Sequence, residues 1–179
     1  MTDPRSQSRY QVRLGWGAEG LRELAPAEVV VIVDAVGSSP QLAADAMSQP
    51  HRPTVFAGAL RNATATARAI VDEQRARGGR VGIALVLAGD DGRFAVEDYL
   101  AAGAIADALS DLGIDHTAPD VAVATEGFRP LRRALAHLLS SSAAGLALAA
   151  DGHRGEVQAA SALDAEDEPT VFSAPTDEG

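Results

Sequence analysis

Val29-Val30-Val31-Ile32-Val33-Asp34 is an unbroken apolar run that ends in a carboxylate. A strand with one face in water alternates apolar and polar residues, so this run predicts a central strand that is covered on both faces. Val55–Gly58 and Val81–Gly89 predict two further buried strands, and each of them ends at a glycine. Gln11–Leu14 alternates polar and apolar residues, which predicts an edge strand.

Segments rich in alanine and leucine follow these strands and predict helices. The expected helices are Pro40–Met47, Asn62–Arg77, Phe94–Leu112, most of Pro119–Leu139, and Gly155–Ala162. This alternation is typical of an α/β fold, here a three-layer sandwich with a mostly parallel central sheet flanked by helices. Residues 1–172 are expected to form a single domain with Thr170–Phe172 as its last strand, and residues 173–179 a disordered tail.

The composition narrows the possible functions. The 179 residues include 15 basic and 25 acidic side chains, and the formal net charge of −10 argues against a nucleic-acid partner. The lack of cysteine excludes disulfides and thiol nucleophiles, and no two of the four histidines have the i, i+4 spacing of a helical zinc site. No window approaches the roughly 20 apolar residues that cross a bilayer, and the start has no apolar secretory signal. We therefore expect a cytoplasmic protein with no membrane partner.

Polar residues follow three of the predicted strands. Asp34 is followed by Gly37-Ser38-Ser39, Gly58 by Arg61-Asn62, and Gly89 by Asp90-Asp91. If these strands are parallel, their carboxyl ends share one edge of the sheet, which is where ligands bind in open α/β sheets. This edge is the expected site.

Two readings stay open for the residues after the first two strands. Asp34 is either a Mg²⁺ ligand or general acid/base, or a carboxylate that accepts N–H bonds in the turn. Ser38 and Ser39 either help helix N-terminal amides to hold an anion or act as plain N-caps, and capping alone also explains Asn62.

Two further acidic residues begin the expected helix 94–112. Glu97 and Asp98 can gather around Mg²⁺ together with Asp90 and Asp91, or they can simply favour the positive end of the helix dipole. Adjacent helical residues point about 100° apart, so one of the pair is expected as a ligand and the other as a cap. Gly103, inside the same helix, predicts a close helix–sheet contact or the approach of a ligand.

Several stretches together resemble the 2-phosphosulfolactate phosphatase family. The most specific of them is Glu97-Asp98, which is followed by an Ala-Ala-Gly-Ala-Ile run. The resembling stretches are Val29–Asp34, Phe56–Ala63, Ala88-Gly89 and Val96–Ile105, with weaker likeness at Trp16-Gly17, Ser140–Leu146 and Glu156-Val157.

This resemblance implies an α/β phosphatase that uses Mg²⁺ to hydrolyse a small phosphorylated acid on the route of coenzyme M biosynthesis. It implies catalytic roles for Asp34, Asn62 and Glu97, and metal binding by Asp34, Glu97 and Asp98. It also implies that the substrate-binding residues are Ser38, Ser39, Arg61 and Gly89.

Two features depart from the family pattern. The turn after Asp34 has no arginine, where the family usually has one, and the connection from Asp34 to Val55 is shorter than in the family. A second hypothesis is therefore a catalytically degenerate member that acts as a binding or interaction module and can pair as a homodimer. A nucleotide-binding protein is disfavoured, because no Gly-x-Gly-x-x-Gly or P-loop pattern follows a predicted strand and the chain has no lysine.

Overall fold

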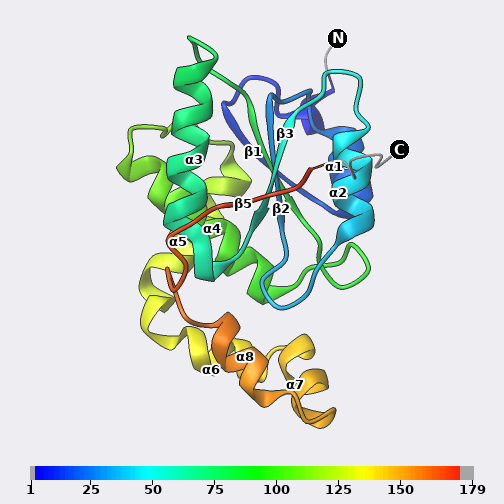
Figure 1. The fold of residues 1–179 in the computed structure, drawn as a ribbon, viewed down its shortest axis with the longest axis vertical. Coiled ribbons are helices and arrows are strands. Elements are labelled where there is room, and N and C mark those ends of the chain that lie inside the picture. The colour runs from blue at the N-terminus through cyan, green and yellow to red at the C-terminus, as the bar shows by residue number, and fades with distance from the viewer. Residues whose placement is uncertain (1–2, 174–179) are drawn as a thin grey trace, which may run out of the picture.

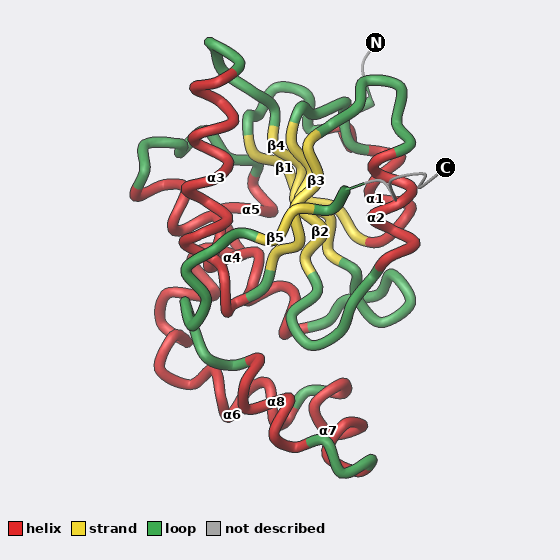
Figure 2. The backbone as a smooth tube through the Cα atoms, in the orientation of Figure 1, coloured by secondary structure: helices red, strands yellow, loops and turns green. Residues whose placement is uncertain are grey.

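A five-stranded sheet with the strand order β1-β4-β2-β3-β5 forms the centre of the computed structural model, which describes residues 3–173 (Figure 2). The strands are β1 (Val12–Trp16), β2 (Val29–Val33), β3 (Thr54–Gly58), β4 (Ile83–Leu87) and β5 (Thr170–Val171). The first four strands are parallel to their neighbours, and β5 pairs with β3 in the antiparallel direction. The mostly parallel sheet is thus confirmed, and β1 lies at its edge as expected.

Helices cover both faces of the sheet (Figure 1). One face carries α3 (Ala63–Ala76), α4 (Val96–Asp111) and α5 (Pro119–Leu131), and the other carries α1 (Gly17–Glu23) and α2 (Pro40–Met47). The α/β sandwich is confirmed by this arrangement.

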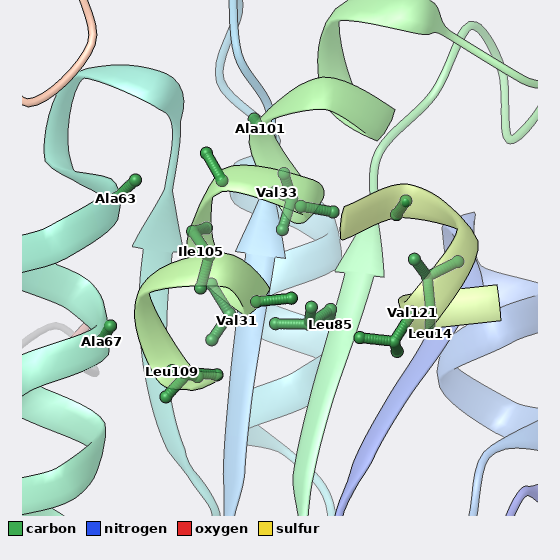
Figure 3. Close-up of a cluster of buried hydrophobic side chains, with 14 of the residues drawn as sticks. Leu14, Val31, Val33, Ala63, Ala67, Leu85, Ala101, Ile105, Leu109 and Val121 are labelled. Carbon is green, nitrogen blue, oxygen red and sulfur yellow. The ribbon is translucent and has the colours of Figure 1, made fainter. Parts of the chain in front are cut away.

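The central strand β2 is buried over its whole length because successive side chains point to opposite, helix-covered faces. Val31 and Val33 belong to the core under α3, α4 and α5, where Ile105 of α4 packs (Figure 3). Val30 and Ile32 belong to the second core under α1 and α2. Full burial of each such side chain stabilises the fold by about 1.5–3 kcal/mol, which explains why this run has no polar residue.

Three further helices lie beyond one end of the sheet. These are α6 (Leu135–Ser141), α7 (Ala143–Ala150) and α8 (Arg154–Ala160), and Figure 1 shows them below the end at which β2 runs into the loop before α2. They therefore stand over the carboxyl ends of the parallel strands.

Two of the helices were not expected from the sequence. The segment of α1 contains two glycines, which are poor helix formers, and the helix is held by its contact with β1. A Cβ atom on Gly20 would lie 2.5 Å from the carbonyl carbon of Gly15, so the two backbones touch. The apolar segment of α7 gave no helical periodicity, because its neighbours are other helices and not the sheet.

Gly103 explains how α4 and α5 pack. A Cβ at this position would lie 2.3 Å from the carbonyl oxygen of Ala124 in α5. The close contact is therefore between two helices, and the expected helix–sheet contact is wrong.

Two other expectations concern the ends and the environment of the chain. The tail predicted for residues 173–179 lies, apart from Ser173, outside the described residues. None of the helices in the described range is both long enough and apolar enough to span a bilayer.

Candidate active site

The carboxyl ends of β2, β3 and β4 meet at one edge of the sheet, as the sequence predicts. The neighbours β2 and β4 lead into helices on opposite faces, since α2 covers one face and α4 the other. Such a change of direction opens a crevice outside the strand ends, and ligands bind in that crevice in open α/β sheets.

Two adjoining cavities occupy this place. The first, of about 370 Å³, lies by the ends of β2 and β3, and the second, of about 600 Å³, lies by the ends of β2 and β4. Asp34, Val36 and Gly37 line both of them. The volumes are those of small-molecule sites, so one ligand can extend across the loop after β2.

Asp34 directly follows β2 and is half-buried. Its Oδ1 accepts a hydrogen bond from the Gly37 N–H at 2.7 Å, and its Oδ2 accepts one from the Ser39 hydroxyl at 2.7 Å. The turn-forming reading of Asp34 is therefore correct, and the same contacts fix the carboxylate at the rim shared by the cavities. Each oxygen keeps a second lone pair for a cation or a proton.

Asp98 joins the loops that follow β2 and β4. Its Oδ1 accepts the N–H of Ala35 and its Oδ2 accepts the N–H of Gly89, both at 2.8 Å. Burial raises the pKa of Asp98 to about 7, the two backbone hydrogen bonds oppose that rise, and the nearby carboxylates of Asp34 and Glu97 add to it. Asp98 thus sets the spacing of the crevice. It does not cap α4, because the two amides that it accepts belong to the loops after β2 and β4.

Glu97 lies in the first turn of α4, is only 6% exposed and lines the second cavity together with Asp34 and Asp98. The charges of Asp34 and Glu97 both raise the pKa of Asp98, so the three groups lie close together and form a region of negative potential. Within residues 3–173, no group of three or more acidic, His or Cys side chains is arranged to hold a metal by itself. Mg²⁺ usually takes one or two carboxylates and completes its shell with water and substrate phosphate, so Asp34 and Glu97 fit such a site.

Asn62 and Arg61 line the first cavity. The Asn62 side chain is used for the turn after β3: it accepts the Ala59 N–H at 2.9 Å and donates to the Ala57 carbonyl at 3.0 Å. It sits at the N-cap position of α3 but makes no side-chain cap bond. Arg61 forms an ion pair with Glu166 at 2.6 Å, and both partners are about 40% exposed.

The remaining predicted residues surround the same crevice. Ser38 and Ser39 line the first cavity, and Gly89 lines the second. Ser39 precedes α2, but its hydroxyl bonds to Asp34 and not to the helix N-terminus, so the plain N-cap reading is wrong for its side chain. Gly89 has φ of +67°, and a Cβ there would lie 2.2 Å from the Arg93 carbonyl oxygen, so only glycine fits this loop.

Sequence reasoning missed the walls that α7 and α8 supply. Both helices come from a segment about a hundred residues after Asp34, and no periodic or spacing signal connects them to the sheet edge. Their cavity-lining residues are Ala143, Ala144, Ala147 and Leu148 from α7, and Glu156, Ala159 and Ala160 from α8.

One family model matches a segment that contains most of the residues of this site. A family model described as 2-phosphosulpholactate phosphatase matches residues 41–168. The matched segment contains Asn62, Glu97 and Asp98, whereas Asp34 precedes it. No curated protein is similar enough to the chain to count as a match. Since the family model spans well over half of the chain, the protein belongs to the 2-phosphosulfolactate phosphatase family.

Proposed function

We propose that the protein is a Mg²⁺-dependent phosphatase that hydrolyses a small phosphomonoester. The observation that carries this proposal is that three carboxylates, Asp34, Glu97 and Asp98, line one cavity in the crevice outside the ends of β2 and β4. Membership of a phosphatase family supports the same reaction class.

The reaction adds water across one bond. An oxygen atom from water bonds to phosphorus, the bond between phosphorus and the ester oxygen breaks, and the leaving alcohol oxygen takes up a proton. The products are inorganic phosphate and the alcohol. The protein therefore has to bind a dianion, place a water molecule and tolerate the charge that spreads over the phosphoryl oxygens.

Negative charge dominates the lining of the two cavities. Arg61 is the one basic residue among their described lining residues, and Glu166 already partners it. Bound Mg²⁺ would supply the missing positive charge at the phosphoryl oxygens. Asp34 and Glu97 would hold the ion, because both face the second cavity and Asp34 is fixed by two hydrogen bonds.

The other residues of the site bind and position. Ser38 offers a hydroxyl to a phosphoryl oxygen, and Arg61 offers the remaining N–H groups of its guanidinium. Asp98 holds the Ala35 and Gly89 amides and so keeps the loops that carry Asp34 and the second cavity wall at a fixed distance. Asp98 is thus a positioning residue.

The direct test is phosphate release from 2-phosphosulfolactate and from simple phosphomonoesters, with Mg²⁺ and with a chelator. We expect turnover that requires Mg²⁺ and returns when the ion is added back after chelation. Turnover that is equally fast in the chelator would refute the metal requirement, and a folded protein that releases no phosphate from any ester would refute the activity.

One observation favours a second candidate, a family member that binds ligands without catalysis. Both oxygens of Asp34 and both oxygens of Asp98 already accept hydrogen bonds within the protein, and a metal ion would have to share or displace these contacts. Phosphate release separates the candidates, since only a phosphatase turns over an ester. Calorimetry with Mg²⁺ and inorganic phosphate then shows whether a non-catalytic member still binds these ligands.

A further inference from the structure

The second cavity combines the carboxylate cluster with an apolar wall. The wall comes from two distant parts of the chain, the segment that leads into α4 and the helix α7. Its apolar residues are Phe94, Ala95, Val96, Ala143, Ala144, Ala147 and Leu148. A phosphate held near Asp34 would leave this wall facing the rest of the substrate.

The aromatic residue of this wall is exposed and packs against two other rings. Phe94 is 64% exposed, yet its ring packs against Trp16 and Tyr99, with a distance of 5.4 Å between ring centroids in both pairs. These contacts restrict the ring, so covering it costs less side-chain entropy than covering a ring without neighbours, and it removes apolar surface from water.

The charged residues that line this cavity within residues 3–173 are all acidic. Among the described residues that line the second cavity there is no arginine, while five carboxylates line it, Asp34, Asp90, Glu97, Asp98 and Asp151. Arg93 lies nearby in the chain but forms an ion pair with Asp90 at 3.2 Å. A substrate with a second anionic group would bring that group among these carboxylates, and the Mg²⁺ held by Asp34 and Glu97 would already be engaged by the phosphate. Placing the second anion there is therefore unfavourable in a partly buried site.

We infer that the substrate is a phosphomonoester whose alcohol part is apolar, carries no negative charge and lies in the second cavity against α7. The inference rests on the proposed phosphatase activity. The inferred substrate differs from the one in the family's name, because 2-phosphosulfolactate carries a carboxylate and a sulfonate beside its phosphate. The cavity volume of about 600 Å³ accommodates an alkyl or aryl group of several carbon atoms.

The test compares esters that differ only in the alcohol part, with Mg²⁺ present. From methyl to butyl phosphate, each added methylene should raise kcat/KM about 3- to 4-fold, the gain expected for burying one CH₂ group. Butyl phosphate should exceed 4-phosphooxybutanoate, its carboxylated counterpart, by at least about 10-fold, because the added carboxylate meets like charge. The two alcohols leave with similar intrinsic ease, so the ratio reports binding in the cavity.

A pair of variants on α7 ties the preference to this wall. Ala147 lines the cavity, whereas Ala150 at the end of the same helix does not. Ala147→Arg should raise kcat/KM for 4-phosphooxybutanoate and lower it for butyl phosphate, while Ala150→Arg should leave both unchanged. A gain for one ester cannot arise from misfolding, so this readout stands even if the variant is less stable.

The possible failures are distinct. If butyl phosphate and 4-phosphooxybutanoate are turned over equally, or if 2-phosphosulfolactate is preferred to both, the inference is overturned while the phosphatase activity stands. If no ester releases phosphate from the folded protein, the proposed function fails and the inference fails with it.

Discussion

The pH dependence of stability gives a quantitative test of the crevice, because it isolates one buried carboxylate. Asp98 is 3% exposed, and burial raises its pKa from 3.8 to about 7. The folded protein therefore holds a proton on Asp98 over a pH range in which the unfolded chain has already lost it. Between these two pKa values the folded state binds more protons than the unfolded state, so stability falls as the pH rises.

The magnitude follows from the two pKa values. From pH 5 to pH 8, the contribution of Asp98 to the free energy of unfolding decreases by roughly 3 kcal/mol. The Asp98→Asn variant has no such titration, because an amide does not ionise. At pH 5 the variant should be less stable by about 1–3 kcal/mol, because its side-chain NH₂ faces one of the N–H groups of Ala35 and Gly89. At pH 8 this loss should be about 3 kcal/mol smaller, so the variant should equal or exceed the wild type.

The assay is urea unfolding of both proteins at pH 5 and pH 8 in a chelator, so that no metal ion lowers the cost of the charge. Asp115→Asn, at an exposed loop position, is the matched control and should change stability equally at both pH values. If the Asp98→Asn effect is the same at pH 5 and pH 8, the ionised carboxylate carries no burial penalty and the raised pKa of Asp98 is wrong.

Three other changes test Glu97, the contact between α4 and α5, and the pair of Arg61 and Glu166. Glu97→Gln should lower kcat/KM by at least about 10-fold and weaken Mg²⁺ binding measured by calorimetry, because it removes a charge that faces the second cavity; unchanged Mg²⁺ affinity would show that Glu97 is no ligand. Gly103→Ala should destabilise the protein by about 1–3 kcal/mol in urea unfolding, since its Cβ would meet the Ala124 carbonyl; a stabilised variant would contradict the close contact. Glu166→Gln frees Arg61 and should lower KM for phosphomonoesters, whereas Arg61→Gln should raise KM. Each change should alter stability by less than about 1 kcal/mol, because the ion pair is exposed. Opposite shifts in KM would mean that Arg61 does not contact the substrate.

The sheet could be predicted because its strands are apolar on both faces and must therefore be buried on both. An apolar run such as Val29–Val33 is stable only under helices on both faces, and alternating strands and helices force parallel pairing. The meeting of the loops after β2, β3 and β4 at one edge then follows from topology alone. That is why Asp34, Arg61 and Glu97 were expected near one another without any structural information.

The details of the site depend on tertiary contacts that no local pattern contains. The Ser39 hydroxyl donates to Asp34 at 2.7 Å, although the local sequence favours a helix cap. Asp98 bonds to two amides that are 63 and 9 residues away in the chain. The apolar wall of α7 reaches the cavity through the packing of α6, α7 and α8, which leaves no periodic signal at the sheet edge.

Asp34→Asn is the sharpest test of the proposal that the carboxylate after β2 takes part in metal-dependent phosphate release. The amide can still accept the Gly37 N–H and can donate to the Ser39 oxygen, so the variant keeps the turn and loses only the charge. The measurement is Mg²⁺-dependent phosphate release from butyl phosphate and 2-phosphosulfolactate, with Asp72→Asn, which is 70% exposed on α3, as control. We expect Asp34→Asn to lose at least about 10²-fold in kcat with an unchanged urea midpoint, while the control stays active. Full activity of Asp34→Asn would contradict the claim and place the reaction elsewhere.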